Sequence, residues 1–296
     1  MDSLLIHSRV ERARPLLGTV VKISIQGLPE AEANSAINNG FAVISKVHGL
    51  MSFHEGASEL SQLNRSGYKK SIEVHPYTFD VLRRTVDLAA DTHGVFDPTI
   101  AGHLVEWGLL PSPEISEEID PKASWRDIEL LEGNRVQFNR PLLIDLGGIA
   151  KGYAVDRAIE SLCADEEVQC CVNAGGDLRV QGPYLERIRL NVQPSSQKIP
   201  VLEIENGSVA SSGGHGLGRR IDGKATGLHL DGSSRNAVGA HSFVSVLADE
   251  CVTADALTKV VLAKCAKADP ILRSRGAAAY LHNACSGWQK LGIAHE

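Results

Sequence analysis

The chain has 296 residues and a formal net charge of −6, from 30 Lys and Arg against 36 Asp and Glu. Its hydrophobic content of 43% is ordinary for a globular protein and excludes a disordered or collagen-like chain. The mild acidity, with no basic run, argues against a nucleic-acid-binding protein that neutralises phosphates, and the length allows one large domain or two intimate lobes.

The N-terminal half carries both strand and helix signals. Apolar and polar residues alternate from Gly18 to Gln26, which predicts a strand, and apolar residues at helical spacing predict a helix over 30–50. Ser58 is expected to cap a short helix that ends near Leu63. The expected elements that follow are a helix over 77–91, an exposed excursion over 111–126, and a hairpin of 128–131 with 135–138.

The C-terminal half is richer in predicted strands. A short buried strand over 142–146 is expected to run through Gly147-Gly148 into a helix over 149–163, and a later helix, capped by Thr253, is expected to end near Ala266. The irregular interleaving of strands and helices favours an α+β architecture over a regular βαβ array. The other expected strands are 168–173, 177–181, 187–193, 201–204 and 243–247.

The N-terminus and the cysteines bear on the expected compartment. The apolar run Leu4-Leu5-Ile6 is too short for the core of a signal peptide, and no segment reaches the length of about 18 apolar residues that a membrane span needs. As written, the sequence therefore predicts a cytoplasmic protein. The six cysteines form no C-x-x-C pair and are expected to be plain thiols.

Glycines are concentrated in one part of the chain: 14 of the 28 fall between Asp145 and Gly232. Residues 144–156 fit neither a Rossmann fingerprint nor a Walker A loop. A glycine-rich helix N-terminus beside Lys151 suits a phosphate or pyrophosphate, and the alternative is a tight strand–helix turn with a surface lysine. Similarly, the double glycine before Asp177 is typical of a β-bulge or hairpin corner.

Several shorter patterns are weaker signals. Asp97-Pro98-Thr99 predicts a turn in which the Asp97 carboxylate caps Thr99. Asp255 lies at the start of a predicted helix, where the helix dipole alone favours an acid. The segment 211–215 lacks the nucleophile elbow of a serine hydrolase, and His54-Glu55 lacks the second histidine of a zinc protease.

Five motifs occur in the same order as in a known family. They are Met51-Ser52-Phe53-His54 with Ser58-Glu59 and Leu63-Asn64; Gly94-Val95-Phe96-Asp97-Pro98-Thr99 with Trp107-Gly108; Asp145-Leu146 through Ala150-Lys151-Gly152-Tyr153 to Asp156; Ala174-Gly175-Gly176-Asp177; and Ala254-Asp255-Ala256. In this combination and order the chain resembles the ApbE family, the FAD:protein FMN transferases.

The resemblance implies both a fold and an activity. The fold would be T-fold-like α+β, with mixed or antiparallel sheets and flanking helices, in a single domain over residues 1–296 whose two intimate lobes hold FAD in a cleft. The activity would be a Mg²⁺-dependent transfer of FMN from FAD to a Thr or Ser of an acceptor protein, with release of AMP. No nucleic acid and no membrane span would take part.

The resemblance also assigns roles to individual residues. His229 would accept the proton of the acceptor hydroxyl, and Asp255 would be the second catalytic residue. Mg²⁺ would be held by the Gly148 carbonyl, the Asp255 carboxylate and Thr258. The residues expected to contact the cofactor are Met51, Ser52, Asp97, Thr99, Trp107, Gly108, Asp145, Lys151, Gly175, Gly176 and Asp177.

This chain departs from the family pattern in three places. Where the family has a metal-binding Thr four residues after the Asp, this chain has Lys259, and Thr258 lies about 100° away around the helix. A lysine there would either weaken Mg²⁺ binding or replace the metal by a permanent cation. The segment 229–234 is a residue shorter than in the family and lacks its proline, and 212–215 replaces a Ser-Gly-Asp-Tyr.

The departures leave two alternatives to a transferase. One is an FAD pyrophosphatase, in which water replaces the acceptor and FMN and AMP are both released. The other is an FAD-binding protein that has lost catalysis. A third, less specific hypothesis is a small-molecule-binding α+β domain unrelated to flavin, which the coincidence of five motifs argues against.

Overall fold

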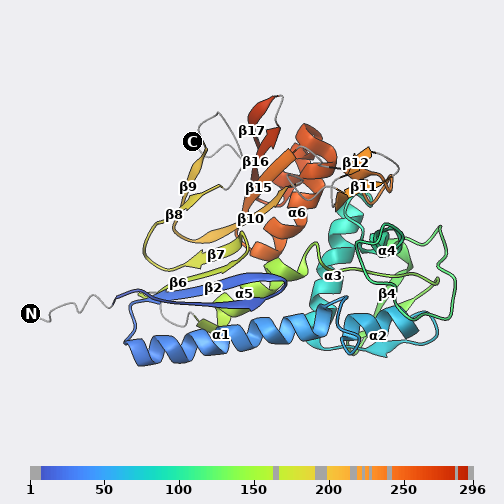
Figure 1. Cartoon of the computed structure of the whole chain (residues 1–296), viewed down its shortest axis with the longest axis horizontal. Helices are drawn as coiled ribbons and strands as arrows, with labels where there is room; N and C mark the ends of the chain where they lie inside the picture. The colour runs from blue at the N-terminus through green and yellow to red at the C-terminus, as the bar shows by residue number, and fades with distance from the viewer. Residues whose placement is uncertain are drawn as a thin grey trace, which may run out of the picture.

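The computed structural model describes residues 8–162, 167–190, 199–213, 219–221, 224–226, 229–238, 242–283 and 286–292. An open antiparallel sheet forms the larger lobe (Figure 1). Its order is β1-β2-β6-β7-β10-β15-β16-β17, and every neighbouring pair is antiparallel. The strands are β1 (Val10–Leu16), β2 (Thr19–Gln26), β6 (Gln169–Ala174), β7 (Asp177–Gln181), β10 (Gly207–Gly213), β15 (Ser242–Ala248), β16 (Ala278–Asn283) and β17 (Gly287–Gly292).

Three helices pack on one face of this sheet. α1 (Glu30–Met51) lies against α5 (Ala150–Leu162), α5 against α6 (Cys251–Lys264), and α6 against β10 and β15 (Figure 1). The predicted spacing of apolar residues explains the contact, because Ile37, Phe41 and Ile44 share one buried side of α1. The described helices include none long and apolar enough to cross a membrane.

The opposite face of the sheet carries a smaller apolar cluster. The hairpin of β8 (Glu186–Arg189) and β9 (Val201–Ile204) covers it, and the cluster includes Leu178, Val209 and Phe243 from the sheet itself. The strand expected over 187–193 corresponds to β8, which ends at Arg189. The last part of the prediction cannot be compared, since 191–198 lie outside the described residues.

A second lobe packs at the C-terminal end of α1. It combines helices with a small sheet of order β3-β5-β4 (Figure 1). One continuous apolar core joins Phe41 of α1 to Phe138 of this lobe. The predicted two-lobed α+β fold is therefore confirmed. Its elements are α2 (Glu59–Ser66), β3 (Ile72–Glu73), α3 (Pro76–Asp91), a 3₁₀ turn (Pro98–Ile100), α4 (Ala101–Glu106), a 3₁₀ turn (Trp125–Asp127), β4 (Ile128–Leu131) and β5 (Arg135–Phe138).

Short elements complete the fold near the C-terminal half of the larger lobe. They are two-stranded pairs of β11 (Arg219–Ile221) with β12 (Lys224–Thr226) and of β13 (His229–Leu230) with β14 (Ala237–Val238), a 3₁₀ turn (Cys265–Ala268) and α7 (Asp269–Ser274). The sequence predicted none of them separately, because each is too short to show a period of its own.

Three sequence predictions were wrong in detail. Residues 142–146 are largely buried, but they join no sheet; instead, the Asn64 side chain binds both the N–H and the C=O of Ile144. Thr253 does not cap α6, which begins at Cys251. Cys170 is disulfide-bonded rather than a free thiol, whereas Cys171, Cys251 and Cys265 are free.

The early start of α6 has a cause far away in the sequence. The buried Asp156 carboxylate, on α5, accepts hydrogen bonds from the backbone N–H of Cys251 at 2.9 Å and of Val252 at 2.8 Å. A carboxylate that accepts from the first amides of a helix acts as an N-cap, although here another helix supplies it. Arg179 of β7 binds the same carboxylate at 2.8 Å, so Asp156 ties α5, α6 and the sheet together.

Candidate functional site

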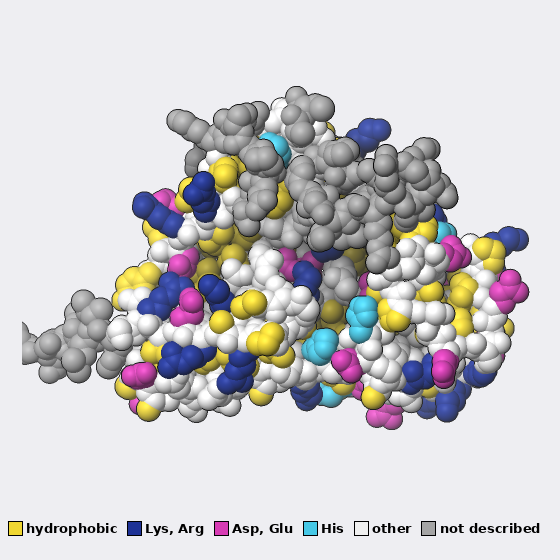
Figure 2. All heavy atoms as spheres, viewed as in Figure 1, with side chains coloured by type: hydrophobic (Ala, Val, Ile, Leu, Met, Phe, Trp, Pro, Cys, Tyr) yellow, Lys and Arg dark blue, Asp and Glu magenta, His cyan; other side chains and the backbone are white. Residues whose placement is uncertain are grey.

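A cavity of about 450 Å³ lies between the end of α1 and the start of α5. Met51, Ser52, Asp145 and Lys151, four of the residues predicted to contact the cofactor, line it. Figure 2 shows histidine side chains gathered on the face near the end of α1. The remaining lining comes from the β1–β2 turn, the C-terminal part of α1 and the segments around them: Leu17, Gly18, Val47, His48, Phe53, His54, Leu110, Gly147 and Ala150.

Local hydrogen bonds fix the wall that follows α1. Ser52 is the C-cap of α1, and its carbonyl accepts from the Ser58 hydroxyl at 2.7 Å. The Ser58 oxygen in turn accepts from Ser61 N–H at 3.0 Å, which is the helix cap that the sequence predicted. His48 was missed as a lining residue, although its position one turn before Met51 puts both on the same side of α1.

The opposite wall is the turn that leads into α5. Asp145 N–H donates to the Pro98 carbonyl at 2.9 Å, so the turn is attached to the second lobe. Burial raises the pKa of Asp145, and the N–H groups of Gly147 and Leu146 and the charge of Lys259 counter part of that effect. The Asp145 side chain thus lines the cavity beside backbone donors.

Charged side chains gather next to the cavity, where α5, α6 and β7 meet. Lys151 forms an ion pair with Asp177, which is buried at the start of β7, and Asp177 also accepts from Ser211 N–H at 3.3 Å. Burial alone would lower the pKa of Lys151, but the carboxylates of Asp255 and Asp177 raise it above its ordinary value. Lys151 is therefore a cation at neutral pH, and its charge interacts with the carboxylates of Asp177 and Asp255.

Asp255 is the most enclosed member of this group. Its side chain is 0% exposed; one carboxylate oxygen accepts from Gly152 N–H at 3.0 Å, and the other forms an ion pair with Lys259. Burial would raise the pKa of Asp255, but Lys259, Lys151 and the hydrogen bonds together lower it, so the group is charged.

Gly152 makes this arrangement possible, because α5 and α6 approach each other closely there. A Cβ on Gly152 would lie 2.7 Å from the carbonyl carbon of Cys251 and 2.8 Å from the Cβ of Asp255. Both contacts are closer than carbon atoms tolerate. A residue without a side chain is therefore required for the Gly152 N–H to reach the Asp255 carboxylate.

His229 lies within the electrostatic reach of the same group. It is in β13, paired with Val238, and its side chain is half-buried. Burial, together with the charges of Lys259 and Lys151, lowers its pKa to about 4, against the opposing effect of Asp255. The imidazole is therefore neutral around pH 7, which is the form that accepts a proton.

The lowered pKa gives a direct prediction for the free protein. His229 should titrate near pH 4, and removal of the Lys259 charge in Lys259→Met should move that titration to higher pH. NMR of the histidine side chains during a pH titration measures both, with His229→Gln identifying the resonance. A His229 imidazole that titrates at the ordinary pKa of a histidine would contradict the assignment of this site.

The structure gives other predicted cofactor residues a role within the protein. Asp97 accepts from the Thr99 N–H at 2.9 Å and from its hydroxyl at 2.7 Å, as the turn prediction required. Arg235 donates to both at 3.0 Å, and all of them lie away from the cavity lining. Asp97 and Thr99 thus anchor the segment after His229 through Arg235. These hydrogen bonds account for both side chains without the expected contact with a cofactor.

The double glycine proves to be a hairpin corner. Gly175 and Gly176 connect β6 to β7 with φ of +69° and +106°, and Gly176 N–H donates to Asn173 at 2.9 Å. The turn starts β7 at Asp177, which places that carboxylate beside Lys151. Trp107 and Gly108 follow α4 and do not belong to the cavity lining. Leu110, two residues further along the same loop, does line the cavity.

The predicted metal ligands do not form a site for Mg²⁺. Mg²⁺ requires about six oxygen ligands in nearly ideal octahedral geometry. Both oxygens of Asp255 are already bound, and the Thr258 hydroxyl donates to the Asp255 carbonyl at 2.7 Å and meets Ser212 at 2.9 Å. Among the described residues no group of three or more His, Cys, Asp or Glu side chains could hold a metal ion. The Thr258 hydroxyl faces Ser212 of β10, and its assignment as a ligand stays a prediction.

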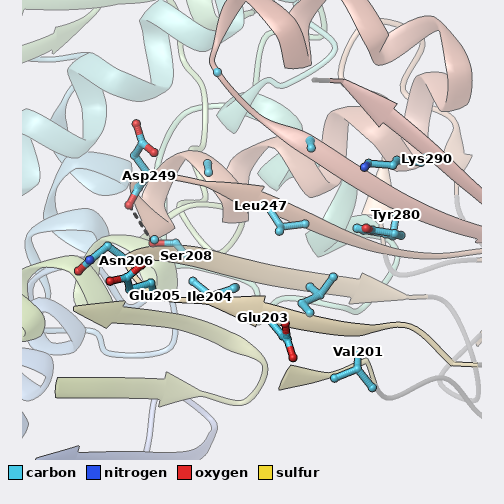
Figure 3. Close-up of a pocket in the computed structure, with 15 residues that line it drawn as sticks. Val201, Glu203, Ile204, Glu205, Asn206, Ser208, Leu247, Asp249, Tyr280 and Lys290 are labelled. Atoms are coloured by element: carbon cyan, nitrogen blue, oxygen red, sulfur yellow. Dashed lines mark hydrogen bonds between the residues drawn. The ribbon is translucent and has the colours of Figure 1, made fainter. Parts of the chain in front are cut away.

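A second cavity, of about 510 Å³, lies over β9, β10, β15 and β16. Glu203, Asp249, Tyr280 and Lys290 are on its walls (Figure 3). Its described lining includes none of the predicted site residues. The smaller cavity is the one where those residues converge.

Comparison with solved structures supports the fold. The crystal structure of the ApbE protein from Thermotoga maritima superimposes with a TM-score of 0.84 at 25% identity, covering 96% of this chain and 97% of that one. The flavin transferase ApbE from Vibrio cholerae gives a TM-score of 0.78 at 21% identity, covering 96% of both chains, and so is similar in fold.

Comparison with curated sequences gives the same relatives. An FAD:protein FMN transferase of Vibrio cholerae serotype O1 is 28% identical over 84% of this chain and 79% of its own length. One of Rhodobacter capsulatus is 30% identical, but over 58% of this chain and only 35% of its own length. The model of the ApbE family matches residues 17–281. Because that match spans most of the sequence, the chain belongs to the ApbE family.

Proposed function

We propose that this protein transfers FMN from FAD to the hydroxyl of a threonine or serine on an acceptor protein and releases AMP. The observation that carries the proposal is the convergence of Met51, Ser52, Asp145 and Lys151 in one cavity beside His229 and Asp255. The names of the curated relatives, FAD:protein FMN transferase, support the same substrate and the same class of reaction.

The cavity fits the flavin end of FAD. Its walls are largely apolar around Val47, Met51 and Phe53, and its volume of about 450 Å³ lies in the usual range for a small-molecule site. Lys151 lines the cavity and also belongs to the cluster of charged side chains where α5, α6 and β7 meet. A ligand with its flavin in the cavity would therefore present its pyrophosphate to the lysine.

The chemistry needs positioning and charge more than covalent help from the protein. The acceptor hydroxyl oxygen attacks the phosphorus of the FMN half, and the bond from that phosphorus to the oxygen of the AMP half breaks. A ring nitrogen of neutral His229 takes the hydroxyl proton, and AMP leaves with the bridging oxygen. Lys259 occupies the Asp255 carboxylate that the family resemblance assigns to Mg²⁺.

The test is to incubate the purified protein with FAD and a candidate acceptor protein that carries an exposed threonine. Intact mass should show the acceptor gaining one FMN, and chromatography should show an equal amount of AMP. Release of free FMN and AMP with no gain in acceptor mass would mean hydrolysis of FAD instead. Bound FAD that stays intact with every acceptor would reject the proposal in favour of a flavin-binding protein.

A further inference from the structure

Lys259 and Asp255 form one closed unit on α6. They are four residues apart, so their side chains lie on the same side of the helix. The Lys259 ammonium pairs with the carboxylate of Asp255 and donates to the Asp255 carbonyl at 3.0 Å. Lys259 is only 13% exposed and Asp255 is 0% exposed. A pair so enclosed is not screened by solvent as a surface ion pair is.

The lysine side chain also fills the space where a metal would have to lie. A Cβ on Gly148 would be 3.6 Å from the Cε and 3.8 Å from the Cγ of Lys259. The aliphatic part of the side chain thus runs beside Gly148 to Asp255, the two residues expected to share Mg²⁺. Phe96 lies 3.4 Å from the same Cβ position, so the space is closed from another side as well.

Two ammonium groups lie at this position, each paired with a carboxylate. Asp145, His229 and Asp177 all experience the charge of Lys259, and Asp177 and His229 also experience that of Lys151. The ammonium groups of Lys151 on α5 and Lys259 on α6 therefore lie close together next to the cavity. A pyrophosphate needs positive charge in that volume, and a lysine provides it without a metal.

We propose that the Lys259 ammonium takes the place of the divalent cation, so that this protein binds FAD and transfers FMN without a metal ion. This inference rests on the proposed function for its substrate. In the transfer step, the attacking hydroxyl oxygen bonds to the phosphorus of FMN, the bond to AMP breaks, and the hydroxyl proton passes to His229. Lys259 and Lys151 balance the negative charge on the phosphate oxygens throughout and are neither consumed nor deprotonated.

The first test uses the unaltered protein after treatment with EDTA. FAD affinity, measured by quenching of flavin fluorescence, should agree within about twofold with and without millimolar Mg²⁺. Electron paramagnetic resonance should show no stoichiometric binding of Mn²⁺, with or without FAD. FMN transfer to the acceptor should proceed at the same rate in both buffers. Stoichiometric Mn²⁺ binding that strengthens FAD affinity would overturn the proposal.

The second test exchanges the lysine. Lys259→Thr places a hydroxyl four residues after Asp255 and should lower FAD affinity about tenfold or more in EDTA. Mg²⁺ should restore that affinity, and Mn²⁺ should now bind. Lys259→Met should lose FAD affinity without metal rescue, whereas Lys267→Met, which removes an exposed lysine beyond α6, should change nothing.

The outcomes separate this inference from the proposed function. If the protein transfers FMN only with Mg²⁺ and binds Mn²⁺, Lys259 does not replace the metal, although the activity stands. If no acceptor gains FMN in either buffer, the proposed activity fails, while Mn²⁺ binding and FAD affinity still decide the role of Lys259. Thermal unfolding of each variant establishes that it is folded before either readout is interpreted.

Discussion

Replacement of His229 by glutamine is expected to slow FMN transfer by about 10²–10⁴-fold, the usual contribution of a general base. The pKa of His229 is lowered to about 4, so the imidazole is free to take up a proton at neutral pH. Glutamine keeps a polar side chain of similar reach but has no basic nitrogen. Since His229 is not in the cavity lining, FAD affinity should stay within about twofold.

Single-turnover measurements with saturating FAD and acceptor separate the transfer step from binding. The matched control is His48→Gln, which changes a histidine that lines the cavity. That variant should alter FAD affinity and leave the transfer rate nearly unchanged. Equal losses of rate in both variants, or a full rate in His229→Gln, would remove His229 from the proton transfer.

Signals that are local in the sequence predicted their structures well. The strand over β2, the helices α1 and α3, and the β4–β5 hairpin follow from periodicity and turn residues that act over a few positions. The Ser58 cap and the Asp97–Thr99 turn are equally local hydrogen bonds. Such elements need no knowledge of the rest of the chain.

Predictions failed where a distant residue determines the local structure. Residues 142–146 read as a strand, but Asn64, 80 positions away from Ile144, satisfies that backbone instead. α6 begins before Thr253 because Asp156 caps it from α5. These partners meet only after the chain has folded, and no pattern within a window of the sequence contains them.

The candidate site divides in the same way. Family motifs selected Met51, Ser52, Asp145 and Lys151, and the fold brings these four to one cavity. Asp97 and Thr99 instead accept hydrogen bonds from Arg235. No short sequence pattern contains all three residues. Lys259 stood out as a departure from the family, and its spacing of four from Asp255 already allowed an ion pair on a helix. That the pair is enclosed beside Gly148 required the packing of α6 against α5 and of Phe96 beside Gly148.

The Asp156→Ala variant is expected to lose about 3–5 kcal/mol of unfolding free energy, a large share of the stability of a domain. Asp156 is fully buried and accepts from Cys251 N–H, Val252 N–H and Arg179. Alanine would leave those amides without an acceptor in the interior, which costs about 1–3 kcal/mol for each. Denaturant unfolding of the purified variant measures the loss.

Asp156→Asn is the matched control, because it keeps the shape and one accepting oxygen but removes the charge that pairs with Arg179. Its loss of stability should fall between those of alanine and of the unaltered protein. The same capping bonds fix the first turn of α6, and this helix carries Asp255 about one turn later and Lys259 about two turns later. Asp156→Ala should therefore also weaken FAD binding under conditions where it remains folded. The alanine variant could instead have the same unfolding free energy as the asparagine variant and bind FAD normally. In that case the cap does not hold α6 against α5, and the position of Lys259 must depend on the Gly152–Asp255 hydrogen bond alone.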